Sequence, residues 1–126
     1  MKWLTCEQVR QAAKESLEDA IECSILHYEQ IQQATIEEIE EKVSMFSCAY
    51  CALCRRYYKA YKVERLRCRD CPLEKAGYRC EKANSPWRRV KWAWAHRYNP
   101  SGEDDFRKEV DNMLTILKSL KKGETK

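Results

Sequence analysis

Residues 48–80 begin with Cys48-Ala-Tyr-Cys51-Ala-Leu-Cys54 and continue, thirteen residues later, with Cys68-Arg-Asp-Cys71-Pro72. Six of the eight cysteines of the chain fall in this stretch. Two C-x-x-C pairs at about this separation are the usual arrangement of a structural zinc site with four thiolate ligands. The sequence therefore predicts a basic zinc module over residues 48–82, with Zn²⁺ held by Cys51, Cys54, Cys68 and Cys71.

Two further cysteines, Cys48 and Cys80, leave the ligand set open. Either could replace one of the four ligands, and ligation by cysteines alone also permits an iron–sulfur cluster. The simpler interpretation makes both of them buried thiols beside the site. Four thiolates leave no open position on zinc, so we expect the metal to be structural. Disulfides are the alternative, but in a reducing compartment eight cysteines favour metal ligands.

The 126-residue chain is long enough for one domain with a modest core, and 44% of its residues are hydrophobic and 35% charged. No apolar run approaches the about 18 residues that cross a bilayer. The N-terminus has no apolar signal region. We therefore expect a cytoplasmic protein without a membrane partner.

Helix signals dominate the N-terminal third. Thr5 opens a capping box before a helix predicted over residues 6–33, and Thr35 opens another before a helix over residues 36–47. Apolar residues recur at helical spacing in both segments. Because the connection is short, we expect the two helices to pair antiparallel as an acidic helical hairpin over residues 5–47.

Two more helices are predicted over residues 85–121. Ser85-Pro86 supplies an N-cap and a proline at the first helical position, and Asn99-Pro100-Ser101-Gly102 marks a turn. The expected buried faces are Trp87, Val90, Trp94 and Tyr98 in the first helix, and Phe106, Val110, Met113, Leu114, Leu117 and Leu120 in the second. The sequence thus predicts a mainly α-helical single domain over residues 1–126, with about four helices around the zinc module.

The net charge of +4 hides a strong asymmetry along the chain. Residues 1–47 carry 4 basic and 10 acidic side chains, whereas residues 48–98 carry 14 basic and 4 acidic ones. Aromatic residues are interleaved with these cations, and cations attract phosphates while exposed aromatics stack on bases. We therefore predict nucleic-acid contact by Arg55, Arg56, Lys59, Lys62, Arg65, Arg67, Arg69, Arg88 and Arg89. The alternative places the aromatics in the core and the cations on a solvated face.

Catalytic signatures are missing from the sequence. The chain has two histidines, His27 and His96, and nothing that resembles G-x-S-x-G, H-E-x-x-H or a phosphate-binding glycine loop. A closed four-thiolate zinc site also differs from the open sites of zinc hydrolases. We expect a protein that is not an enzyme and has no small-molecule substrate.

Three motifs carry a resemblance to known sequences: Ser24-Ile25-Leu-His27-Tyr28-Glu29-Gln-Ile31, the two cysteine pairs with Pro72-Leu73, Gly77 and Cys80, and Ser85-Pro86-Trp87. In these motifs the chain resembles a loosely defined group of small cysteine-rich phage and prophage proteins of uncertain function. The resemblance implies a phage-related origin, and hence a place in the host cell cytoplasm. It also implies that Cys80 belongs to the core with the two pairs.

Two functions remain in competition. The first is a small zinc-binding protein that contacts nucleic acid through its basic module. The second is a protein-binding inhibitor or adaptor, such as a phage factor that acts on a host or defence protein. If the cations cluster on one exposed face, nucleic-acid contact is favoured. If the N-terminal carboxylates neutralise the cations, the charge has a structural role.

Overall fold

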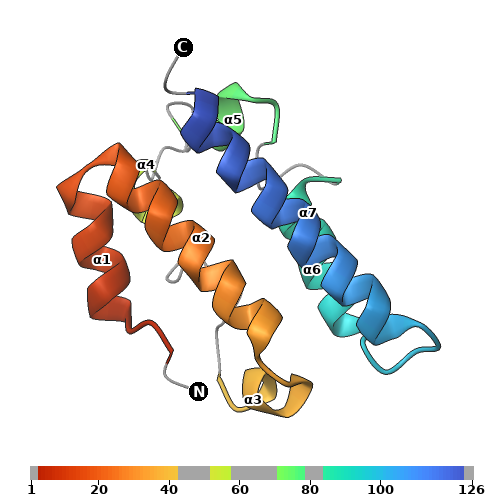
Figure 1. Cartoon of the computed structure of the whole chain (residues 1–126). Coiled ribbons are helices and arrows are strands. Elements are labelled where there is room, and N and C mark those ends of the chain that lie inside the picture. Colours follow the sequence, from red (N-terminus) through yellow and green to blue (C-terminus); the bar gives the residue numbers. More distant parts are fainter. Residues whose placement is uncertain (1–2, 43–51, 58–70, 79–83, 124–126) are drawn as a thin grey trace, which may run out of the picture.

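The computed structural model describes residues 3–42, 52–57, 71–78 and 84–123. This part of the chain forms helices α1 to α7 and contains no strand, which confirms a mainly α-helical fold. The two longest helices, α2 (Leu17–Gln33) and α7 (Gly102–Gly123), lie side by side and run antiparallel (Figure 1).

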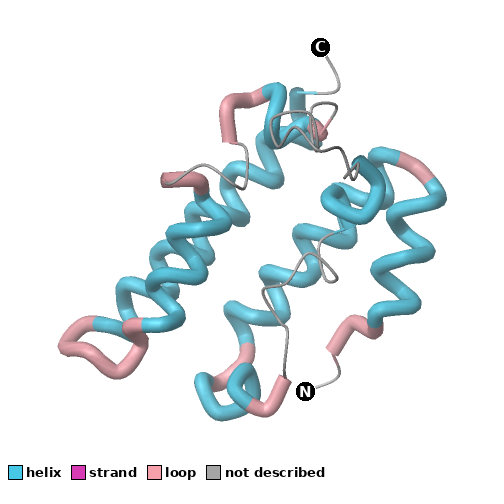
Figure 2. Tube along the Cα trace, turned by 180° about the vertical axis from the view of Figure 1, so that it is seen from behind, coloured by secondary structure: helices cyan, strands magenta, loops and turns pink. Residues whose placement is uncertain are grey.

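Two shorter helices flank this central pair. Helix α1 (Cys6–Glu15) packs against α2 on the side away from α7, and α6 (Pro86–Ala95) packs against α7. Figure 2 shows the same order from behind, with a short connection between α1 and α2 at one end of the bundle and another between α6 and α7 at the opposite end. The arrangement buries one face of each helix, which stabilises helices of this length far more than their intrinsic propensity does.

The predicted helix over residues 6–33 is divided at Ser16, so the expectation of one continuous helix is wrong. Ser16 has an extended backbone (φ −165°, ψ 165°), and its hydroxyl accepts a hydrogen bond from the Asp19 amide at 3.0 Å. This is the geometry of an N-cap. The chain reverses there, and the N-terminal hairpin is therefore made by α1 and α2.

The capping boxes are present as predicted. The Thr5 hydroxyl accepts from the Gln8 amide at the start of α1, and the Thr35 hydroxyl accepts from the Glu38 amide at the start of α3 (Ile36–Glu40). Helix α3 is five residues long, and α2 packs against α1 and α7. Residues 43–47 of the helix predicted over 36–47 lie outside the described residues.

The core lies between α1, α2, α6 and α7, and α3, α4 (Ala52–Tyr57) and α5 (Pro72–Lys75) also contribute side chains to it. It contains the predicted stripes of the first and last helices, from Val9 to Ile31 and from Phe106 to Leu117, and Leu120 is half-buried. Phe106 is fully buried, and burial of a side chain of that size stabilises the fold by about 3 kcal/mol. The prediction that Tyr98 belongs to the buried face is wrong, because α6 ends at Ala95 and Tyr98 is 74% exposed in the turn that follows.

Arg107 ties the start of α7 to the end of α2. Its guanidinium donates to the carbonyl oxygens of Ile31 (2.8 Å), Gln32 (3.2 Å) and Ala34 (2.7 Å). The last carbonyls of a helix have no partner within the helix. A side chain from a neighbouring helix supplies the missing donors here, and its positive charge suits the negative end of the α2 dipole.

The predicted turn between α6 and α7 is tightly built. Ser101 has a positive φ of 62°, which is uncommon for a residue other than glycine. Gly102, the next residue, is buried, and a Cβ atom there would collide with the carbonyl oxygens of His96 and Arg97. The glycine is therefore required by close approach of the backbone.

Candidate nucleic-acid interface

The predicted zinc ligands lie mostly outside the described residues. This holds for Cys51 and Cys68, for the side chain of Cys54 in α4, and for Cys48 and Cys80. Cys71 has a described side chain, which is buried with 5% of its surface exposed. No group of three or more His, Cys, Asp or Glu side chains within the described ranges is placed to hold a metal ion. The zinc site stays a prediction.

Two short helices locate the cysteine pairs in the fold. Helix α4 (Ala52–Tyr57) begins directly after Cys51, and α5 (Pro72–Lys75) begins directly after Cys71. The second residue of each helix, Leu53 and Leu73, is buried in the core. Helix α4 packs against α1 and α2, and α5 packs against α7, at the end of the bundle where α2 begins and α7 ends (Figure 1).

Arg56 has a structural contact. Its guanidinium donates to the carbonyl oxygen of Ala13 at 2.8 Å, near the C-terminal end of α1. The bond fastens α4 to α1 and supplies one of the donors that the end of α1 lacks. Arg56 was predicted to contact nucleic acid, and the contact that the structure gives it is this bond within the fold. The predicted cations without a described side chain are Arg55, Lys59, Lys62, Arg65, Arg67 and Arg69.

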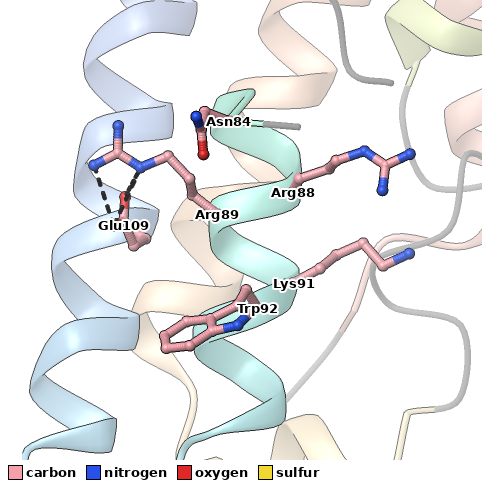
Figure 3. Close-up of a pocket in the computed structure, with 6 residues that line it drawn as sticks. All are labelled: Asn84, Arg88, Arg89, Lys91, Trp92 and Glu109. Atoms are coloured by element: carbon pink, nitrogen blue, oxygen red, sulfur yellow. Dashed lines mark hydrogen bonds and ion pairs between the residues drawn. The ribbon is translucent and has the colours of Figure 1, made fainter. Parts of the chain in front are cut away.

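The other two predicted cations, Arg88 and Arg89, lie on α6 beside a hollow of about 570 Å³. The opposite face of α6 is buried: Val90 and Ala93 are in the core, and the ring of Trp94 lies 5.1 Å from that of Phe106 on α7. This packing turns the polar face of the helix outward. The hollow is lined by Asn84, Arg88, Arg89, Lys91, Trp92 and Glu109 (Figure 3).

Arg88, Arg89 and Lys91 differ in their surroundings. Arg89 turns toward α7 and forms an ion pair with Glu109 at 3.2 Å. Arg88 and Lys91 extend together to the other side of α6, away from α7, as Figure 3 shows. The Lys91 ammonium lies 4.3 Å from the centre of the Trp87 ring, a cation–π contact that orders the side chain and keeps its charge.

Trp92 is the most exposed tryptophan described, with 64% of its surface accessible. Its ring stacks on His96 with the ring centres 3.9 Å apart and the planes inclined by 25°. His96 is held in turn, because its Nδ1 lies 2.8 Å from the Trp92 carbonyl oxygen. Neither Trp92 nor Lys91 was among the residues predicted to contact nucleic acid. The spacing of four residues between Trp92 and His96 is the signal that predicts their stacking on one helix face.

Several cations elsewhere are offset by carboxylates of the N-terminal third. Arg97 pairs with Glu40 at 3.0 Å, Lys118 pairs with Glu29 at 3.7 Å, and Lys121 pairs with Glu22. The hydroxyl of Tyr98 also donates to Glu40, and this bond, followed by the Arg97 guanidinium, lowers the pKa of the Glu40 carboxyl. The acidic charge of residues 1–47 is therefore partly neutralised by cations of other elements, mainly between α2 and α7, and Arg97 is the one cation of residues 48–98 in these three pairs.

The buried polar residues of α2 do not form an activated pair. Cys23 and His27 are four residues apart and both are buried. Burial raises the pKa of the Cys23 thiol, which keeps it protonated at neutral pH. A thiol needs a lowered pKa to act as a nucleophile, so Cys23 is a packing residue.

No known protein family matches the chain, and no curated protein or solved structure is significantly similar to it. None of the helices in the described ranges has the length and apolar character needed to cross a membrane. The hollow on α6 is therefore interpreted from its own chemistry.

Proposed function

We propose that the protein is a small, non-enzymatic zinc-binding protein that contacts nucleic acid through its basic central region and the outward face of α6. The observation that carries the proposal is the outward face of α6, where three cations, Arg88, Arg89 and Lys91, line one hollow together with the exposed Trp92. Cations that neutralise phosphates and an aromatic face that accepts a base are the two parts of a nucleic-acid surface.

The surroundings of α6 support this proposal. Glu109 is the one carboxylate among the residues that line this hollow, and it is paired with Arg89. By contrast, Lys118 and Lys121 of α7 are paired with carboxylates of α2. Residues 48–98 carry the net positive charge of the chain. The part of α6 that points away from the bundle thus adds to the charge of the predicted zinc module instead of cancelling it.

The proposal is tested by the salt dependence of oligonucleotide binding. We expect labelled single- or double-stranded oligonucleotides to bind at about 50 mM salt and to dissociate steeply as salt rises, because each neutralised phosphate releases a counterion. The triple change Lys59→Ala, Lys62→Ala and Arg65→Ala should reduce the slope of log K against log[salt] by about 0.7–0.9 for each phosphate contact removed.

A matched control separates local contact from net charge. Lys108→Ala, Lys118→Ala and Lys121→Ala remove the same number of positive charges from α7, where two of the three lysines pair with α2. This control should leave the slope close to that of the unchanged protein. If the unchanged protein binds neither single-stranded nor double-stranded oligonucleotides at about 50 mM salt, nucleic-acid binding is rejected.

A further inference from the structure

We propose that the predicted zinc ion is a clasp between two halves of the bundle, and that its removal lets α2 and α7 separate at the end where α2 begins and α7 ends. The first half contains α1, α2 and α4, and the second half contains α5, α6 and α7. This inference rests on the zinc-binding part of the proposed function and adds what the metal does for the arrangement of the helices.

The first step is the placement of the helices that follow the two cysteine pairs. Helix α4 begins directly after Cys51, contains Cys54, and packs against α1 and α2. Helix α5 begins directly after Cys71 and packs against α7. Both helices lie at the same end of the bundle (Figure 1). The two cysteine pairs therefore adjoin different halves of the bundle, although only thirteen residues separate them in the sequence.

The second step is how each of these helices is held in its own half. In α4, Leu53 is fully buried, and the Arg56 guanidinium donates to the Ala13 carbonyl oxygen of α1 at 2.8 Å. At the start of α5, Cys71 and Leu73 are buried, with 5% and 2% of their surfaces exposed. Displacement of either helix would expose a buried leucine, which is unfavourable in water. A bond between the two cysteine pairs therefore acts on the halves themselves.

The third step is the difference between the two ends of the α2–α7 pair. At one end, Arg107 donates to three carbonyl oxygens at the end of α2. Toward the other end, Lys118 pairs with Glu29 at 3.7 Å. Lys121 pairs with Glu22 there, and between 41% and 54% of each of these four side chains is exposed. Exposed ion pairs contribute little to stability, so the polar contacts are weaker at the end near α4 and α5.

One metal ion bound by both cysteine pairs would join the two halves at this weaker end. The sulfur atoms of a tetrahedral site lie about 2.3 Å from zinc, so the start of α4 would be fixed relative to the start of α5. Loss of the metal removes that restraint, because its binding energy is folding energy for the segment it closes. Helices α1, α2, α6 and α7 would stay formed, since α1 packs on α2 and α6 packs on α7. The change is an opening between the halves, not a loss of these helices.

The test compares amide hydrogen exchange of the zinc-loaded protein with that of the same protein after a chelator has removed the metal under reducing conditions. We expect exchange in residues 113–120, in the second half of α7, to accelerate about tenfold or more, because local opening exposes these amides. Residues 106–111, beside the Arg107 contacts, should change by less than about twofold. Because the chain itself is unchanged, this comparison does not depend on the folding of a variant.

Leu73→Ala separates the clasp from the binding of the metal. It removes the side chain that anchors α5 in the core and leaves every cysteine in place. We expect one zinc ion per chain in this variant, together with an acceleration of exchange in residues 113–120 about as large as that on metal removal. Leu26→Ala is the matched control. It makes the same change at a leucine of α2 that is 43% exposed, and it should alter neither zinc content nor exchange.

Equal exchange in the zinc-loaded and metal-free protein would overturn the clasp and leave the zinc site in place. Acceleration by the same factor at both ends of α7 would also overturn it, because the metal would then stabilise the whole fold without joining its halves at one end. Exchange in Leu73→Ala as slow as in the unchanged protein would have the same consequence. Absence of zinc from the purified protein would overturn both the clasp and the zinc-binding part of the proposed function.

Discussion

Arg107 joins two helices that are distant in the sequence, and its contacts are those of a helix cap. Its three backbone acceptors lie between Ile31 and Ala34, at the end of α2. In return, the Gln32 side chain donates to the Arg107 carbonyl oxygen at 3.0 Å and to Asp111 at 2.7 Å. The exchange fixes the register of α7 along α2. An arginine suits this position because its guanidinium presents several donors in one plane.

Replacement of Arg107 by alanine should therefore lower the free energy of unfolding by about 2 kcal/mol, because the carbonyl oxygens at the end of α2 lose their hydrogen bonds from the charged guanidinium. Equilibrium unfolding in urea measures the effect. Lys108→Ala is the matched control, because Lys108 is exposed on the same helix and should change stability little. Equal effects of the two substitutions would show that the Arg107 contacts contribute nothing in solution.

Glu40 offers a prediction of pH dependence. The Tyr98 hydroxyl and the Arg97 guanidinium lower the pKa of its carboxyl in the folded protein. Because the pKa is lower in the folded protein, ionised Glu40 stabilises the fold. This stabilisation is fully present above the carboxyl pKa of the unfolded chain, about 4.3, and is lost as the pH falls through the lower pKa of the folded protein. Glu40→Gln should thus be less stable than the unchanged protein at pH 7, and the difference should shrink toward zero near pH 3.

Urea unfolding at a series of pH values checks this expectation. Glu37→Gln removes an exposed carboxylate from the same helix and serves as the control. A difference between Glu40→Gln and the unchanged protein that stays constant from pH 7 to pH 3 would contradict the proposed linkage.

Local contacts of single residues were accessible to sequence analysis, whereas distant ones were not. The caps by Thr5, Thr35 and Ser85 follow from residue type and a spacing of three, and all three are present. The contacts of Arg107 and Glu40 join residues more than 50 positions apart. A sequence with 24 basic and 20 acidic side chains offers many such pairs, and only the packing of the helices selects among them.

At the scale of elements, the division between α1 and α2 shows what an apolar stripe can and cannot reveal. Leu17 continues the helical spacing from Ala13 to Ala20, so the stripe passes through Ser16 without interruption. The sequence signal for the break is local. Ser16 is a capping residue, and it is followed by the acidic residues Glu18 and Asp19 in the first turn of α2. Periodicity correctly identified the buried faces but could not locate the reversal of the chain.

Ser16→Ala should therefore destabilise the protein by about 1 kcal/mol, because the Asp19 amide loses its acceptor. Ser16→Asp should restore most of that stability, since aspartate is also a good N-cap and favours the positive end of the dipole. Thermal unfolding of the two variants measures both effects. A stability for Ser16→Ala equal to that of the unchanged protein, or a failure of aspartate to compensate, would argue against a cap at this position.

At the scale of the whole molecule, helix partners were the hardest feature to predict. Proximity in the sequence favoured a pair between residues 6–33 and 36–47. In the described part of the chain α2 packs on α7, α1 and α4, while residues 43–47 of the predicted partner lie outside that part. Caps and stripes define each helix, whereas the partner depends on which apolar faces fit together. The candidate site divides in the same way: Arg88 and Arg89 were predicted from charge, but the role of Glu109 required the packing of α6 on α7.

The zinc module gives a prediction at this scale. We expect elemental analysis to find one zinc ion per chain. Cys54→Ser should lose the metal, and residues 48–80 should then unfold, because the binding energy of a structural metal is folding energy for the segment it closes. Helices α1, α2 and α7 should remain, since they bury their apolar faces against one another. Circular dichroism combined with limited proteolysis follows both parts.

Cys6→Ser is the matched control, because Cys6 is an exposed cysteine on α1 and should affect neither metal content nor helicity. Complete loss of helix in Cys54→Ser would show that the bundle depends on the module. Metal-free folded protein, or stoichiometric iron with sulfide, would contradict the zinc assignment itself.

The turn between α6 and α7 restricts substitution at two adjacent residues for two separate reasons. Gly102 is closed to a side chain, because a Cβ atom there would collide with the main-chain oxygens of His96 and Arg97, directly after α6. Ser101 has room but a left-handed backbone, so glycine or asparagine would suit it better than serine does. Exchange of these two residues would keep composition, charge and loop length unchanged and would still break the hairpin. The order of these two small residues is therefore as much a requirement of the turn after α6 as their identity is.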